Sequence, residues 1–163
     1  MLKRILIYTS LFCYSVLSFG QSGLSSMPMI SPVKGYLSSG FGYRISPFTK
    51  KKTYHEGLDI VAPTGEPVYA PADGVVTAVG RIKRLGKYII LSHGNGIVTK
   101  YGHLKSIKIR EGQRVKRDAV IGSVGMTGRT TGSHLHYEIL INGKNVDPRK
   151  FIIYDPNRDL ETI

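Results

Sequence analysis

The chain has 163 residues, of which 41% are hydrophobic and 21% charged, and these values fit one globular domain rather than a disordered chain or a coiled coil. Its 19 Gly and 8 Pro favour many turns over long helices. The net charge of +12 predicts an anionic partner such as nucleic acid, acidic lipid or an acidic wall polymer.

The first twenty residues have the three-part pattern of a secretory signal peptide. Met1 to Arg4 form a short basic start, Ile5 to Leu17 are mostly apolar, and Ser18-Phe19-Gly20 supplies small residues before an expected cleavage. The alternative is a membrane anchor that stays attached, but the apolar run is shorter than the roughly 20 residues of a bilayer span. Cleavage would remove two basic residues and Cys13, the only cysteine, leaving a charge of +10. The exported chain would lack disulfides, and the anionic cell envelope becomes its expected partner.

Residues 21–30 are polar and rich in serine, which predicts a flexible lead-in to a domain over residues 31–154. Within the domain, short β-branched or aromatic runs alternate with Gly, Pro and Asn turns. These candidate strands are 67–70, 75–79, 88–92, 97–101, 120–124 and 135–141. Asn95-Gly96 and Asn142-Gly143 predict tight hairpins, because both residue types accept a positive φ. The pattern predicts an all-β fold, a single antiparallel β-sandwich or barrel, followed by a polar tail at 155–163 that we expect to fray.

His55-Glu56-Gly57-Leu58-Asp59 is the first of three motifs that contain histidine. A spacing of four returns a side chain to the same face of an extended or a helical backbone, and Gly57 with the following Ile-Val-Ala-Pro favours the extended form. A neutral imidazole and a carboxylate are ligands suited to zinc. Taken alone, however, such a pair is more typical of a surface histidine beside a solvated carboxylate.

Two further histidines lie near the ends of candidate strands. His103, in Tyr101-Gly102-His103-Leu104, could point toward the same site without binding a metal. His93 borders the Asn95-Gly96 turn, and we expect it to be hydrogen-bonded there without a functional role.

His134-Leu135-His136 opens the candidate strand 135–141. Because residues two apart on a strand share a face, the two histidines project together with Glu138 further along, while the alternate residues face apolar packing. His55, Asp59 and one histidine of this pair would form a set of three protein ligands. Three ligands with an open fourth position are typical of a catalytic zinc, whereas a structural zinc site prefers four ligands, usually with thiolates.

Together these motifs resemble the lysostaphin-type, or LytM-like, zinc endopeptidases, whose fold is the duplicated hybrid motif. Matching segments also occur at Gly40 to Arg44, at Ala70 to Val76, at Gly128 and Gly132, and at Ser133 to Glu138. The resemblance covers about residues 31–150. Three histidine motifs in the same order are far more specific than any one of them.

This resemblance implies an exported enzyme that hydrolyses peptide cross-links of peptidoglycan, with one Zn2+ in a narrow groove of a β-rich fold. It implies that His55, Asp59 and His136 bind the zinc and that His103 and His134 form the unligated catalytic pair. Zinc lowers the pKa of a bound water toward ~7 and polarises a carbonyl. One histidine would take the proton and one would stabilise the oxyanion, in an order that the sequence leaves open. The expected location is the periplasm, the cell envelope or the cell exterior, without a membrane anchor after cleavage.

Other classes of function remain as alternatives. A non-enzymatic envelope protein would bind peptidoglycan or activate another hydrolase, but such proteins have usually lost ligands, and all five positions are filled here. A biotinyl or lipoyl carrier is suggested by Gly65 to Pro71 and by Glu111 to Val115, but we find no lysine at a tight hairpin tip. A nucleic-acid binder is suggested by charge alone.

The type of cross-link that would be cut also stays open. The resemblance allows glycine-rich bridges and direct D-amino-acid links, and the choice between them depends on the loops that line the groove. Lys50 to Lys52 and the segment from Arg81 to Lys87 are candidates for such loops. They could equally be ordinary exposed loops.

Overall fold

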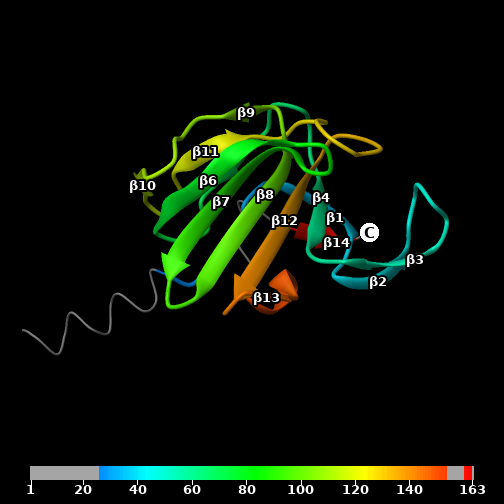
Figure 1. Ribbon diagram of the computed structural model, residues 1–163, viewed down its shortest axis with the longest axis horizontal. Helices are drawn as coiled ribbons and strands as arrows, with labels where there is room; N and C mark the ends of the chain where they lie inside the picture. Colours follow the sequence, from blue (N-terminus) through cyan, green and yellow to red (C-terminus); the bar gives the residue numbers. More distant parts are fainter. Residues whose placement is uncertain (1–25, 154–159, 163) are drawn as a thin grey trace, which may run out of the picture.

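The computed structural model in Figure 1 describes residues 26–153 and 160–162. The strands are β1 (Gly35–Ser39), β2 (Gly42–Ile45), β3 (Lys52–His55), β4 (Leu58–Val61), β5 (Pro67–Tyr69), β6 (Gly74–Ile82), β7 (Gly86–Gly94), β8 (Ile97–Leu104), β9 (Ser106–Ile107), β10 (Arg114–Val115), β11 (Val120–Ser123), β12 (His134–Ile141), β13 (Lys144–Val146) and β14 (Leu160–Thr162). Within the described residues, the one helical segment is the single 3₁₀ turn Pro148–Lys150. The expected all-β fold is therefore confirmed.

The strands form one large sheet, one small sheet and one separate hairpin. The large sheet has the order β10-β6-β7-β8-β12-β4-β1-β14, with β13 paired to β12, and β1 and β14 are the one parallel pair among the described strands. The small sheet, β5-β11-β9, lies over one side of the large sheet, and in the part of the chain that the structure describes β2 and β3 pair only with each other (Figure 1). This arrangement is an antiparallel sandwich with a two-stranded arm at one end.

The apolar core lies between the two larger sheets. All six strands predicted from the sequence are present as β5, β6, β7, β8, β11 and β12. Alternate residues of β12, namely Leu135, Tyr137 and Ile139, are fully buried, as the period of two predicts. Both predicted hairpins also form, since Asn95 (φ 49°) and Gly96 (φ 73°), like Asn142 (φ 49°) and Gly143 (φ 77°), adopt left-handed backbone angles.

The two ends of the domain differ from the sequence-based expectation where the structure describes them. Residues 26–30 belong to the expected flexible lead-in, yet Pro28 is buried and the Met29 carbonyl accepts a hydrogen bond of 2.7 Å from the Ile153 amide. Leu160–Thr162 belong to the tail that we expected to fray, yet they pair with β1. Residues 27–30 are apolar, unlike the serines before them, and backbone pairing holds Leu160–Thr162 in place. The expected signal peptide, residues 1–20, lies outside the described residues.

Within residues 26–153 and 160–162, we find no helix with the length and apolar character needed to cross a bilayer.

Candidate metal centre and groove

Three side chains of the predicted ligand set come together on neighbouring strands. Asp59 of β4 and His136 of β12 are directly opposite in the antiparallel register, so their side chains share one face of the large sheet. His55 is the last residue of β3, and the short turn Glu56-Gly57 carries the chain from there into β4. The sequence analysis expected His55 and Asp59 on one continuous extended segment. In the structure they lie on two different strands, β3 and β4.

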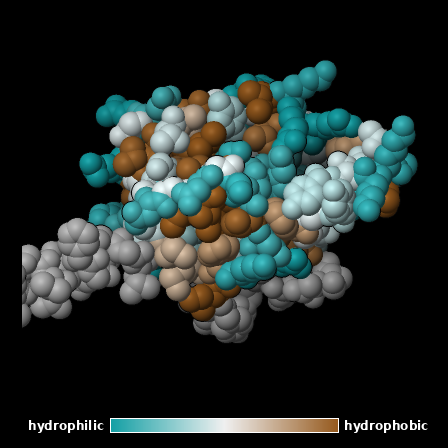
Figure 2. Space-filling model, turned by 60° about the horizontal axis from the view of Figure 1, so that its bottom comes forward, coloured by the Kyte–Doolittle hydropathy of each residue, from teal (hydrophilic) through white to brown (hydrophobic). Residues whose placement is uncertain are grey.

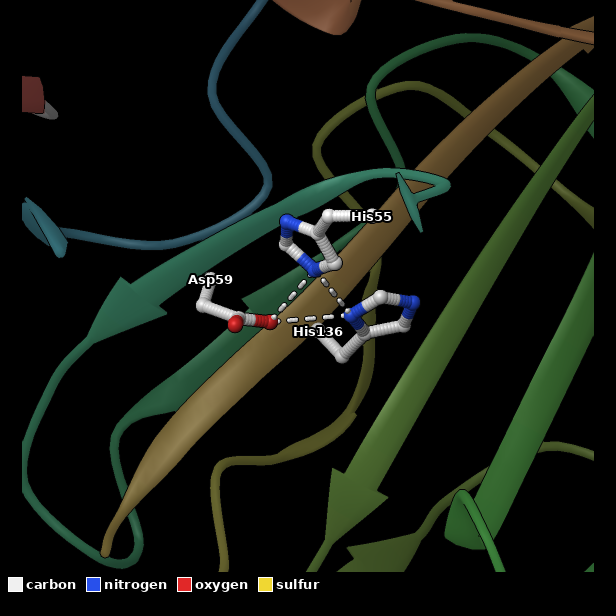
Figure 3. Close-up of side chains that lie close together, drawn as sticks. All are labelled: His55, Asp59 and His136. Carbon is white, nitrogen blue, oxygen red and sulfur yellow. Dashed lines mark hydrogen bonds and ion pairs between the residues drawn. The ribbon is translucent and has the colours of Figure 1, made fainter. Parts of the chain in front are cut away.

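The ligand atoms of these residues form a small triangle (Figure 3). His55 Nε2 lies 3.1 Å from Asp59 Oδ1 and 3.2 Å from His136 Nδ1, and His136 Nδ1 lies 2.9 Å from Asp59 Oδ1. All three side chains are buried. Two imidazole nitrogens and one carboxylate oxygen at this separation form a group that could hold a metal ion.

The opposite edge of each candidate ligand contacts a group that fixes its orientation. His55 Nδ1 lies 2.8 Å from the Gly40 carbonyl oxygen, and His136 Nε2 lies 3.0 Å from Glu138 Oε1. Both partners only accept hydrogen bonds, so each ring donates its N–H outward and turns a lone pair toward the triangle. Arg44 donates to the outer oxygen of Asp59 over 2.8 Å. Three electron-pair donors therefore converge, and this donor set fits a zinc ion.

The local charges also favour a cation at this place. Burial alone would raise the pKa of Asp59, but contacts with His134, His136 and His55 lower it well below its usual range, so the carboxylate is ionised. Burial alone would lower the pKa of His136, but the carboxylates of Asp59 and Glu138 outweigh it and raise that pKa. Two carboxylates thus stabilise positive charge on both sides of His136.

Two more histidines border the triangle. The His134 ring lies 4.7 Å from the His103 ring between centroids, and His134 Nε2 lies 3.5 Å from Asp59 Oδ1. The Nδ1 atoms of His103 and His134 contact the carbonyl oxygens of Thr127 (2.8 Å) and Gly132 (3.0 Å), which places the proton on Nδ1 and the lone pair on Nε2 in the neutral form of each ring. Burial, with a smaller effect of neighbouring imidazoles, lowers the pKa of His103 to about 4, so this ring is neutral near neutral pH.

His103 has an unusual backbone conformation with a φ of 61°. Such angles are uncommon outside glycine and are held only by surrounding structure. Here the His103 amide donates to the Leu85 carbonyl over 2.6 Å, and the His103 carbonyl accepts from Thr127 N over 3.4 Å. The loops after β6 and β11 thus hold His103 on the site.

These residues line a groove of about 790 Å³. Its walls come from the β2–β3 hairpin, the turn after β3, the loop between β6 and β7, and residues 129–134. The first candidate loop, Lys50 to Lys52, does not line the groove, although the flanking residues 44–49 and 53–56 do. In the second candidate loop, 81–87, Arg84 and Leu85 line the groove. Four of the five histidines line it, His55, His103, His134 and His136.

His93 lies apart from this groove, as the sequence analysis expects. It is buried, with Nδ1 at 2.7 Å from the Asp73 carbonyl oxygen and Nε2 at 2.8 Å from Thr99 Oγ1. These contacts satisfy both ring nitrogens within the fold.

Sequence reasoning missed three partners of the site. The roles of Gly40, Arg44 and Glu138 as contacts of the candidate ligands are visible only in the structure. For Glu138 a signal existed, because a period of two places it beside His136 on the same face of β12. For Gly40 and Arg44 no local signal existed, since both belong to segments whose pairing the sequence did not reveal.

Residues 53–148 of the chain match peptidase family M23, and this segment contains all five histidines and Asp59. The DD-carboxypeptidase/endopeptidase Mpg of Neisseria meningitidis is 48% identical over 112 residues, which cover 69% of this chain and 26% of that protein. The peptidoglycan DD-endopeptidase ShyA of Vibrio cholerae is 42% identical over 118 residues, which cover 72% of this chain and 27% of that protein. The chain thus spans about a quarter of the length of the curated relatives that it matches.

Solved structures give the same result for the fold. The crystal structure of a zinc containing peptidase from Vibrio cholerae superimposes with a TM-score of 0.67 at 36% sequence identity. The match covers 80% of this chain and 39% of that one.

Proposed function

The chain belongs to peptidase family M23, as its resemblance to the lysostaphin-type enzymes indicates, and from this premise we propose that it is a zinc-dependent endopeptidase that hydrolyses peptide cross-links of peptidoglycan. The names of its relatives favour a direct D,D cross-link over a glycine bridge. The basic start and apolar run of residues 1–20 support export to the periplasm or cell envelope.

The observation that carries the proposal is the convergence of three electron-pair donors at one end of an open groove. His55 Nε2, Asp59 Oδ1 and His136 Nδ1 would hold the ion, and their outward contacts fix the tautomers that this requires. When bound, zinc would polarise the scissile carbonyl and make water a nucleophile at neutral pH. A set of three protein ligands leaves room for both.

The chain's own histidines would handle the protons. His103 is neutral near neutral pH, so its free Nε2 can accept a proton and pass it on. His134, whose Nδ1–H is fixed on the Gly132 carbonyl, presents Nε2 close to the ligand triangle, where it would donate to an oxygen that becomes negative once this nitrogen has taken up a proton. Each role is typically worth ~10²–10⁴ in rate, so His103→Ala and His134→Ala would be nearly inactive.

The test is the release of muropeptides from purified sacculi with either direct D,D links or glycine bridges. We expect the wild type to release fragments from the D,D-linked sacculi, and a chelator or His136→Ala to abolish the release. His93→Asn is the matched control, because it alters a buried histidine outside the groove and should leave the release in place. Wild-type protein that binds zinc and sacculi but releases nothing would instead support a wall-binding or activating role.

A further inference from the structure

The β2–β3 hairpin with its connecting loop, residues 42–55, forms an arm that carries an unusual surface. Among the strands that the structure describes, its two strands pair only with each other, and it stands at the edge of the molecule, at the right in Figure 1. An isolated two-stranded hairpin has little stability of its own. One face of the arm turns Arg44 and His55 toward the metal centre, and the other face has no strand of the described residues against it.

Large hydrophobic side chains gather on this arm and are exposed. The exposed fractions are 72% for Tyr43, 64% for Ile45, 48% for Tyr54 and 44% for Phe48. In Figure 2 the projection at the right, which is the arm by its place in Figure 1, carries pale and brown side chains bordered by teal ones. A concentration of exposed apolar side chains on one element marks an interaction site.

The aromatic side chains of the arm are arranged in order. Tyr43 and Tyr54 are directly opposite in the β2–β3 register, with ring centroids 5.1 Å apart and planes at 82°. The Tyr54 ring also packs edge-on against Phe41, with centroids 5.4 Å apart. Lys52 Nζ lies 4.6 Å from the Tyr43 ring centroid. The arm therefore offers flat faces and phenolic hydroxyls that neighbouring side chains hold in place.

The arm is also uniformly basic. Residues 42–55 include Arg44, Lys50, Lys51 and Lys52 and no Asp or Glu. Arg44 is paired with Asp59, whereas the three lysines are exposed. The partner of this surface should thus combine rings or other flat apolar groups with negative charge.

The surface is continuous with the groove. Ile45, Phe48 and Tyr54 belong to both, so a polymer whose peptide branch lies in the groove can extend directly onto the arm. A bilayer or a second copy of the chain could bind the arm without contacting the groove. The continuity therefore favours the polymer substrate as the partner.

We propose that the arm binds a glycan strand of peptidoglycan beside the cross-link that is cut. This choice of polymer rests on the proposed function. Sugar rings would pack their C–H faces on Tyr43 and Tyr54, and their hydroxyls would bond with the phenolic oxygens. Lys50 to Lys52 would meet the carboxylates of neighbouring stem peptides. The arm thus positions the substrate, while the groove carries the chemistry.

The experiment measures binding of the full chain to glycan strands from which all peptides have been removed, so that no bond can be cut. We expect Tyr43→Ala to weaken this binding at least about fivefold, because Tyr43 is the most exposed ring of the arm. Tyr43→Phe keeps the ring and should retain most of the affinity. Tyr36→Ala is the matched control, since Tyr36 lies on β1 outside the arm and is 38% exposed.

Each other outcome overturns the inference. Equal glycan binding by wild type and Tyr43→Ala would remove the arm from substrate recognition. If Tyr43→Ala lost the binding of the wild type to vesicles with anionic phospholipids while its glycan binding was unchanged, the arm would be a membrane site. A dimer that Tyr43→Ala dissociates would make it a self-association surface. Because the assay needs no hydrolysis, glycan binding can succeed even if muropeptide release fails, and the two proposals are tested separately.

Discussion

At the level of single residues, Glu138 links the metal centre to the rest of the large sheet. It is 1% exposed, and its two oxygens accept from His136 Nε2 (3.0 Å), Lys100 Nζ (3.1 Å) and Asn145 Nδ2 (2.9 Å). Burial alone would raise the pKa of Glu138, but these donors lower it to about 2, so the carboxylate is ionised near neutral pH. An ionised carboxylate can only accept, and it therefore keeps the proton of His136 on Nε2.

Replacing this carboxylate should weaken metal binding without removing a ligand. In Glu138→Gln the amide also offers N–H groups, so His136 loses its obligatory acceptor and the charge that increases its basicity. We expect the affinity for zinc to fall about 10–100-fold, measured by competition with a chromophoric chelator. Asp73→Asn is the control, because Asp73 is a carboxylate that pairs with Lys116 and does not line the groove. Equal affinities of the two variants would contradict this role of Glu138.

The period of two along β12 was enough to predict that His134, His136 and Glu138 share one face. His55 and Asp59 were predicted as a pair, and the structure brings them together across a turn between two strands. The contact of Arg44 with Asp59 joins residues 15 apart in sequence through tertiary packing. Local patterns hold no information on such a contact, which explains why it was not predicted.

At the level of elements, the turn between β3 and β4 controls the distance between two candidate ligands. Gly57 in this turn is buried against β12, and a Cβ added there would lie 2.2 Å from the Tyr137 carbonyl oxygen and 2.9 Å from its carbon. The turn can therefore approach the large sheet only with a glycine at this position. This close approach brings His55 within reach of Asp59 and His136.

Gly57→Ala should accordingly push the turn away from β12. We expect a loss of about 1–3 kcal/mol in the free energy of unfolding, together with weaker zinc binding, because both His55 and Asp59 adjoin the turn. Urea denaturation and chelator competition measure the two effects. Gly132→Ala serves as comparison, since a Cβ at this groove residue meets nothing within 4 Å. If Gly57→Ala bound zinc as tightly as Gly132→Ala does, the turn would not set the ligand distance.

The strands that were predicted are the β-branched or aromatic runs that lie between Gly, Pro and Asn turns. Of these strands, β7 alternates between buried and half-buried residues over 88–93, whereas β12 is buried at every position from 135 to 139. In the arm, by contrast, Tyr43 and Ile45 point outward and the alternation is inverted relative to a core strand. Strands β2 and β3 do contain residues that favour β structure, Tyr43, Ile45, Thr53 and Tyr54, but each strand has four residues and gives a weak signal.

At the level of the whole molecule, the candidate metal centre connects two parts of the fold. His55 comes from the separate β2–β3 sheet, whereas Asp59 and His136 come from the large sheet. Within the described residues, Arg44 adds one ion pair across the same boundary, to Asp59. A bound ion would therefore hold the arm against the sheet, and the arm would form both a wall of the groove and the proposed glycan surface.

Zinc should consequently stabilise the domain, and most strongly at the arm. A ligand that binds only the folded state at about 1,000 times its Kd adds about 4 kcal/mol to the free energy of unfolding. We expect zinc to raise the Tm of the wild type and chelator to reverse the change, with no response in His136→Ala. Hydrogen exchange should show the largest gain in protection at residues 42–55, because this hairpin pairs with no other strand of the described chain. Equal gains in β6 and β7, which β8 separates from the ligand strand β12, would instead indicate that the arm is held by packing alone.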